Sequence, residues 1–249
     1  MIEFKIVTPV YNSQDEIIKC VESVKSQTYE HWHMVVVCDG CTDNTVHNAR
    51  KIIGDDDRID LIVLDQNHGH CNSHIVAHNA HTITCDDVFV HLDGDDHLID
   101  EHVLCYVNNV YTTRKHVWAT YGNYMTVSGK TSNCRAVDLK IGIREQIYNN
   151  WPFSHLRTFK CPLWHKLSRD DLTSKNGQLF KAAVDVAIFA PVLEMCGDRI
   201  IYIKRPLYMY NDMHHNNIHT NTHKLNEQVR SAIELASRPR KYALQTLDF

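Results

Sequence analysis

The sequence predicts an α/β fold with a mostly parallel central sheet flanked by helices. Two observations predict it. Across the first hundred residues, apolar β-branched runs alternate with segments in which apolar residues recur at helical spacing. Polar or acidic residues follow each apolar run directly. Because strands that alternate with helices pair in parallel and end at one sheet edge, we expect these polar residues to share a pocket.

The first half contains the more regular elements. Its predicted strands share an apolar, β-branched composition and cover residues 4–10, 34–37, 59–64 and 88–92. The first predicted helix has Ile17, Ile18, Val21 and Val24 at helical spacing. Further helices are predicted for residues 42–53 and 73–80. This order favours parallel strands with helices on both faces.

The second half is less regular, and the sequence shows no linker. Strands are predicted at residues 118–127 and 200–203, and helices at residues 182–196 and 227–236. Pro191 should kink the first of these helices or end it early. Residues 151–164 are rich in aromatics and proline and receive no assignment. We therefore expect one domain that covers residues 1–249.

Three carboxylates lie within four residues at the end of the fourth predicted strand: Asp93, Asp95 and Asp96. Carboxylates this close repel one another unless a cation neutralises them. Asp93 and Asp95 straddle Gly94, so both could face one side and hold a divalent metal, which would in turn hold a diphosphate. The alternative is an acidic β-turn, because Asp-Gly is a common turn pair.

Composition excludes some classes of function. The net charge of -4 provides no basic field for nucleic acid, although a local Arg/Lys patch could contact a membrane surface. No apolar run is long enough to span a bilayer, and the start has no signal-peptide pattern, so we expect a cytoplasmic protein. The nine cysteines are scattered, and one C-x-x-C pair, Cys38 and Cys41, lacks the second pair of a zinc site. A thioredoxin-like redox role is the alternative for that pair. The 18 histidines are mostly isolated, which favours surface or packing roles.

Five segments, in order, carry motifs that belong together. They are Val7-Thr8-Pro9-Val10-Tyr11-Asn12, Ser23 with Gln27 and Thr28, Val37-Cys38-Asp39-Gly40-Cys41-Thr42-Asp43, Asn67 with Gly69, and Leu92-Asp93-Gly94-Asp95-Asp96. This ordered set resembles the family 2 glycosyltransferases of GT-A fold and is far more specific than a lone D-x-D. Cys38 departs from the first acid of the family's V-D-D-G-S-x-D pattern, which leaves Asp39 as the only carboxylate before Gly40.

The resemblance implies a GT-A fold whose sheet is Rossmann-like. It places a nucleotide-sugar-binding half at residues 1–100 and an acceptor-binding half at residues 101–249. It also implies a metal-dependent, inverting transferase that moves one sugar from a nucleoside-diphosphate sugar, most simply a UDP-sugar. The acceptor would be a hydroxyl of a glycan, free or linked to lipid or protein. The chain lacks the Q-x-x-R-W motif and membrane helices of processive members, so one sugar is expected per encounter.

The resemblance also assigns donor-site roles. Asp39 would accept a hydrogen bond from the base, Tyr11 and Pro9 would line base and ribose, and Asp95 would ligate Mn²⁺ or Mg²⁺ with Asp93 near the ribose or metal. The remaining residues implied to contact the donor are Asn12, Asn67, Gly69 and Gly94. Taken singly, Asp39 could be a turn residue and Tyr11 a packing aromatic.

Four residues of the second half complete the implied site. Asp185 fits the family's acidic residue at a helix start and would act as the base, although Val184 replaces the first of the usual two acids. A helix N-terminal Asp that favours the dipole is the alternative. Arg157 would neutralise the diphosphate or grip an anionic acceptor, unless it is ordinary surface charge. His214 or His215 could close over the metal, unless both are solvated loop residues.

Three rival functions remain open from the sequence. A nucleotidyltransferase also needs acids, a metal and a nucleotide pocket, but usually opens with a basic Gly-rich loop that residues 9–14 lack. A degenerate sugar-nucleotide or glycan-binding module would explain the missing acid at position 184. A zinc hydrolase would use the histidines, but no H-E-x-x-H or similar spacing supports it.

Overall fold

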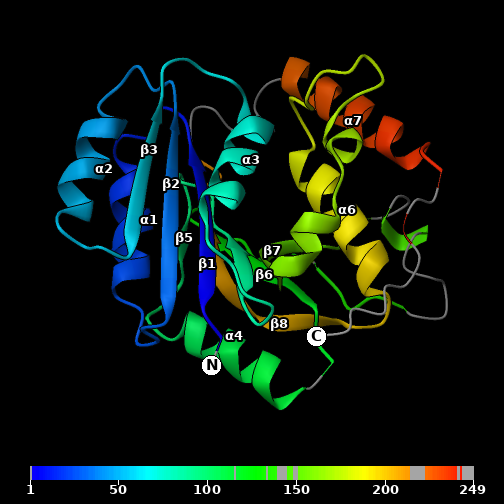
Figure 1. Ribbon diagram of the computed structural model, residues 1–249, viewed down its shortest axis with the longest axis horizontal. Coiled ribbons are helices and arrows are strands. Elements are labelled where there is room, and N and C mark those ends of the chain that lie inside the picture. The colour runs from blue at the N-terminus through cyan, green and yellow to red at the C-terminus, as the bar shows by residue number, and fades with distance from the viewer. Residues whose placement is uncertain are drawn as a thin grey trace.

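The computed structural model describes residues 2–114, 116–132, 134–138, 145–147, 151–213, 222–239 and 242 and confirms the predicted α/β fold (Figure 1). Its described strands form one eight-stranded sheet in the order β3-β2-β1-β4-β7-β6-β8-β5. The strands are β1 Phe4–Val10, β2 Trp32–Asp39, β3 Ile59–Leu64, β4 Val88–His91, β5 His97–Leu98, β6 Ala119–Thr126, β7 Ser154–Lys160 and β8 Ile200–Tyr210.

Strand direction divides the sheet at β4. The four strands β3, β2, β1 and β4 pair in parallel, so their carboxyl ends meet at one edge. β7 then pairs antiparallel with both β4 and β6, β6 pairs in parallel with β8, and β8 pairs antiparallel with β5. The parallel half therefore gathers the predicted polar loops, and β7 brings second-half residues next to β4.

Helices cover both faces of the sheet, as the alternating pattern predicts. The helices are α1 Glu16–Lys25, α2 Thr45–Ile53, α3 His70–Ala80, α4 Val103–Thr113, α6 Val184–Cys196 and α7 Thr222–Ala236, with 3-10 turns η1 Cys161–Lys166 and η2 Arg169–Leu172. Side chains of β2 split between two cores: Val35 and Val37 pack on the face of α3 and α6, and Met34 and Val36 on the face of α1, α2 and α4. Figure 1 shows α6 and α7 beside the sheet half that α3 covers. None of the described helices is long and apolar enough to cross a membrane.

Several elements differ from the sequence prediction. β7 and α4 were not predicted, and β8 extends from the predicted short strand to Tyr210. α6 continues through Pro191 to Cys196, so the predicted early end is wrong. Nearly every residue of α6 is buried, and tertiary packing therefore offsets the hydrogen bond that proline removes.

Two buried histidines predict how stability depends on pH. Burial lowers the pKa of His78 to about 3, and burial followed by the charge of His33 lowers the pKa of His81 to about 3. The folded state therefore keeps both rings neutral while the unfolded chain takes up protons below pH 6.5, so stability is full above that pH and is lost as pH falls toward 3. Each histidine should cost about 1.4 kcal/mol per pH unit in this window. Urea unfolding at pH 7 and pH 5.5 should show a drop in stability of which these two residues account for about 2–3 kcal/mol, and equal stabilities would contradict it.

Candidate active site

The loops after β1 and β2 are joined by side chains that the sequence prediction singled out. Asn12 has a positive φ of 50°, and its side-chain oxygen accepts a hydrogen bond from the Thr42 backbone N–H at 2.8 Å. Its amide nitrogen donates to Thr42 Oγ1 at 3.1 Å. The Cys41 thiol, whose pKa is lowered by a hydrogen bond from Cys38, donates to the Val10 carbonyl at 3.7 Å. Asn12 and the C-x-x-C pair thus fix the two loops together.

The loops after β2 and β3 are joined through Asp39. This buried carboxylate accepts hydrogen bonds from the backbone N–H groups of His68, at 2.8 Å, and Gly69, at 2.9 Å. Gly40 has a φ of +62°, and a Cβ on it would stand 2.2 Å from the carbonyl carbon of Gln66. Only glycine fits there, because the two loops approach each other so closely. A carboxylate has about four lone-pair sites, so Asp39 can accept a further hydrogen bond.

The loop after β4 packs on the end of β1. The Gly94 N–H donates to the Pro9 carbonyl at 3.0 Å, and a Cβ on Gly94 would lie 2.5 Å from the Val10 Cβ. The glycine between the two predicted ligands therefore lets the acidic loop lie directly on Pro9 and Val10. Together with the contacts above, this confirms the predicted placement of all four polar clusters at one sheet edge.

The three carboxylates of the acidic loop differ in environment. Asp93 and Asp95 are half-buried, whereas Asp96 is buried and accepts hydrogen bonds from the Tyr208 hydroxyl at 2.6 Å and the Asn211 N–H at 2.7 Å. Asp96 thus ties the loop to β8. Burial first, and then the charges of Asp95 and Asp93, raise the pKa of Asp96 well above its usual value. Burial, and then the charges of Asp96, Asp95 and Asp93, raise the pKa of Cys20, and burial with the same three carboxylates raises the pKa of Tyr208.

This concentration of negative charge fits a divalent cation. Asp93 and Asp95 offer hard carboxylate oxygens, which Mn²⁺ and Mg²⁺ prefer. Their negative charge acts on three buried neighbours, Cys20, Asp96 and Tyr208, so a cation here would relieve this repulsion. The residues present therefore fit the predicted metal.

Arg157 and Asp185 form an ion pair between β7 and the start of α6. Arg157 lies on β7 opposite His91 of β4, and His91 lies two residues before Asp93. Residues opposite each other on paired strands share a face, so Arg157 and His91 lie on the same face of the sheet. Arg157 is 6% exposed, and its Nη2 donates to Asp185 Oδ2 in the first turn of α6 at 3.0 Å. Arg157 is thus buried, and the alternative interpretation of this residue as an ordinary surface charge is wrong.

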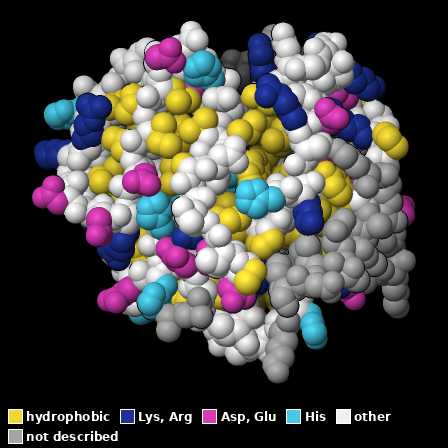
Figure 2. All heavy atoms as spheres, viewed as in Figure 1, with side chains coloured by type: hydrophobic (Ala, Val, Ile, Leu, Met, Phe, Trp, Pro, Cys, Tyr) yellow, Lys and Arg dark blue, Asp and Glu magenta, His cyan; other side chains and the backbone are white. Residues whose placement is uncertain are grey.

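A cluster of histidines beside Asp93 was missed by the sequence analysis. His70, His74 and His78 stand four residues apart on α3, and His91 precedes the acidic loop. His74, His78 and His91 are buried, so the prediction of mostly isolated histidines is wrong for this group. The i, i+4, i+8 spacing was the available signal, because such residues line one helix face. Figure 2 shows histidine and acidic side chains near one another on the face that carries α3.

The remaining predicted residues lie at the rim of the site or outside it. Tyr11 is 40% exposed, and Asn67 is exposed with its side chain bonded to the Gly69 N–H at 3.1 Å. His214 and His215 lie outside the described residues. A separate cavity of about 560 Å³ between η2, α6 and α7 is lined by none of the predicted site residues.

A family model and several curated proteins match this chain. The family model described as glycosyl transferase family 2 matches residues 5–164. The teichoic acid poly(glycerol phosphate) polymerase of Staphylococcus epidermidis is 32% identical over 118 residues, which cover 45% of this chain and 15% of that protein. The chain spans less than half of the length of the first three curated relatives it matches.

Solved structures show the same fold. The S. aureus TarS fragment 1–349 in complex with UDP-GlcNAc matches 96% of this chain and 68% of its own, with a TM-score of 0.69 and 18% identity. The mannosyltransferase PcManGT of Pyrobaculum calidifontis, in complex with GDP-Man and Mn²⁺, matches 93% of this chain and 64% of its own, with a TM-score of 0.64 and 16% identity. The predicted fold class is therefore confirmed.

Proposed function

Because the chain belongs to glycosyl transferase family 2, we propose that it moves one sugar from a UDP-sugar to a hydroxyl of a glycan, lipid-linked or protein-linked acceptor. The observation that carries this proposal is the joining of four loops into one rim at the carboxyl edge of β1, β2, β3 and β4. In parallel sheets, ligands bind beyond this edge. The acceptor would enter from the second-half side, where β7 and α6 lie.

The donor's nucleoside would bind at the first two loops. Asp39, held rigid by two backbone N–H groups, would accept a hydrogen bond from the base, and Tyr11 and Pro9 would line base and ribose. Asn12, Asn67 and Gly69 shape the loops around them. Support for a UDP-sugar comes from TarS, whose structure holds UDP-GlcNAc.

Asp95, with Asp93 beside it, would hold Mn²⁺ or Mg²⁺ on the donor's diphosphate. When bound, such a cation offsets the charge that grows on the departing nucleoside diphosphate. PcManGT and a glucosyl-3-phosphoglycerate synthase of Mycobacterium tuberculosis, both of similar fold, were solved with Mn²⁺. Gly94 brings the loop that carries both aspartates onto Pro9 and Val10, and hence next to the proposed ribose position.

Asp185 would take the proton from the acceptor hydroxyl, which then attacks the anomeric carbon from the face opposite the nucleotide and inverts its configuration. Arg157 holds one oxygen of Asp185 at 3.0 Å and so orients the carboxylate. Its guanidinium also brings positive charge toward the diphosphate. We propose a cytoplasmic protein, with membrane contact limited to a peripheral surface.

A panel of nucleotide sugars tests the proposal and separates it from its rivals. With Mn²⁺ present, we expect slow release of UDP from one UDP-sugar, and none after EDTA is added. Release of pyrophosphate from a nucleoside triphosphate would instead indicate a nucleotidyltransferase. Binding without turnover of any donor, in the presence or absence of metal, would indicate a degenerate binding module.

A further inference from the structure

The histidines of α3 gather against the acidic loop in a way that the donor site does not require. One nitrogen each from His70 and His74 and one carboxylate oxygen of Asp93 lie within 4.8 Å of one another. His70 Nε2 lies 3.1 Å from His74 Nε2 and 3.7 Å from Asp93 Oδ1. His70 is half-exposed, so the group opens to solvent.

These distances suit a small tetrahedral ion. Zn²⁺ binds imidazole nitrogen and carboxylate oxygen at about 2.0–2.2 Å, which places neighbouring ligand atoms about 3.3 Å apart. The two measured separations, 3.1 Å and 3.7 Å, bracket this value. Small side-chain rotations would therefore complete the three-ligand set, and the open side would leave room for a water.

Hydrogen bonds do not join all three side chains of this group. A proton between His70 Nε2 and His74 Nε2 forms a hydrogen bond within that pair and does not reach Asp93. Asp93 Oδ1, at 3.7 Å from His70 Nε2, is too far away for a hydrogen bond. Asp93 Oδ1 therefore faces the two rings without a hydrogen bond to His70.

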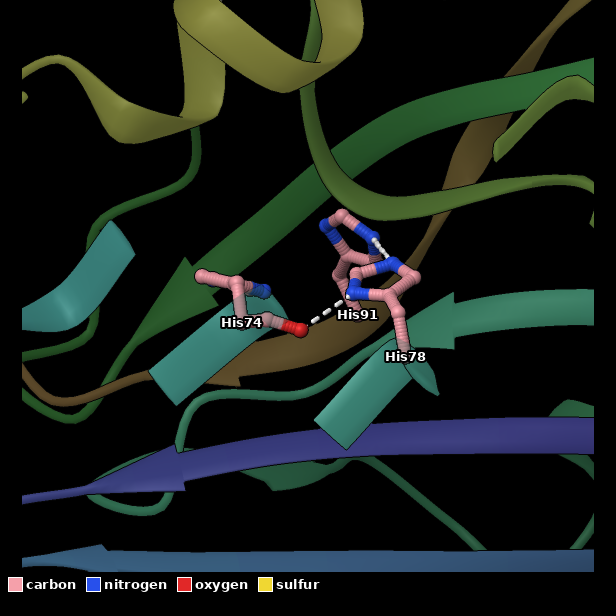
Figure 3. Close-up of side chains that lie close together, drawn as sticks. All are labelled: His74, His78 and His91. Atoms are coloured by element: carbon pink, nitrogen blue, oxygen red, sulfur yellow. Dashed lines mark hydrogen bonds between the residues drawn. The ribbon is translucent and has the colours of Figure 1, made fainter. Parts of the chain in front are cut away.

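Two further histidines fix the ligands in place. His78 donates from Nδ1 to the His74 carbonyl at 2.7 Å, and its Nε2 pairs with His91 Nε2 at 3.0 Å (Figure 3). The Trp164 ring stacks on the His78 ring, and the two ring centroids are 3.9 Å apart. Because His91 ends β4 two residues before Asp93, this bond fastens the helix that carries His74 to the strand that leads into the loop of Asp93. The site is thereby preorganised.

We propose that His70, His74 and Asp93 bind a transition-metal ion of the Zn²⁺ class, at a site that shares Asp93 with the donor cation site but takes its other two ligands from α3. Imidazole ligands select Zn²⁺, Co²⁺, Ni²⁺ or Cu²⁺ over Mg²⁺, which prefers oxygen. The charge of Arg157, which reaches His74, is offset by its pairing with Asp185. The ion would join the start of α3 to the loop after β4. It would thereby link the loop after β3, which leads into α3, to the loop after β4. This site needs no nucleotide and does not rest on the proposed transfer reaction.

Calorimetric titration of the intact chain with ZnCl₂, without nucleotide, tests the proposal. His70→Ala and Asp93→Asn should each weaken the Zn²⁺ affinity at least about tenfold, since each removes one ligand. His70 is half-exposed, so its variant should fold normally. His47→Ala removes an exposed histidine of α2 and should leave the affinity unchanged. Millimolar Mg²⁺ should not displace the ion.

Two outcomes would overturn the proposal. Unchanged Zn²⁺ affinity in His70→Ala would show that this ring is not a ligand. Loss of Zn²⁺ binding in Asp95→Asn would show that the ion belongs to the acidic pair.

EPR of the Cu²⁺-loaded protein should show nitrogen splitting that weakens in His70→Ala. None of these readouts uses UDP, so the donor-site proposal stands or fails separately.

Discussion

Asp95→Ala is expected to abolish the Mn²⁺-dependent part of UDP binding while leaving the fold intact. Asp95 is half-buried on a loop whose attachment to β8 runs through Asp96, so truncation should spare the packing. Removing one partner of a close charged contact typically costs about 2–5 kcal/mol of binding free energy. Calorimetry with UDP, with and without Mn²⁺, measures the loss, and thermal melting checks the fold.

Asp57→Ala provides a matched control for this experiment. Asp57 is an exposed aspartate between α2 and β3, away from the carboxyl ends of the strands. Its variant should bind UDP with Mn²⁺ as the parent chain does. If Asp95→Ala keeps the full Mn²⁺-dependent affinity, the donor cation is held elsewhere, and the assignment of the acidic loop is wrong.

Asp185→Asn should lower kcat about 10²–10⁴-fold while leaving UDP affinity nearly unchanged, because an amide cannot accept the acceptor's proton. The asparagine oxygen can still accept the hydrogen bond from Arg157, so the geometry of the pair should be retained. Transfer or donor hydrolysis gives kcat, and calorimetry gives the UDP affinity. Asp198→Asn, at an exposed position just beyond α6, should change neither quantity.

Two other outcomes for Asp185→Asn would redirect the account. A kcat within a few-fold of the parent value would mean that Asp185 is not the base. Its role would then be limited to favouring the helix dipole at the start of α6 and to pairing with Arg157. A collapse of UDP affinity with unchanged kcat would mean that the pair positions the diphosphate and that another group takes the proton.

The parallel half of the fold was predictable, because β1, β2 and β4 are almost fully buried and the apolar runs of all four strands carry a clear signal. β1 and β3 match the predicted ranges at both ends. β7 was not predicted because Ser154–Lys160 mixes polar residues with aromatics and therefore lacks a clear apolar pattern. The position of β7 between β4 and β6 in the sheet accommodates this mixture. α4 could have been predicted, since Val103, Val107 and Val110 lie at helical spacing.

The sequence predicted which loop residues lie at the site, but it did not predict which residues they contact. Parallel strands bring Asp39, Asn67 and Asp93 to one edge, as the alternating pattern indicates. The bonds from Asp39 to two backbone N–H groups depend on loop conformation. The pairing of Arg157 with Asp185, 28 residues apart, depends on tertiary packing that the irregular second half does not encode in any local pattern.

A crystal structure with a UDP-sugar and Mn²⁺ tests the central claim most directly. We predict the ion on Asp95, the diphosphate against that ion, and the base beside Asp39. A nucleotide bound in the cavity between η2, α6 and α7, with no ion at the acidic loop, would contradict the account.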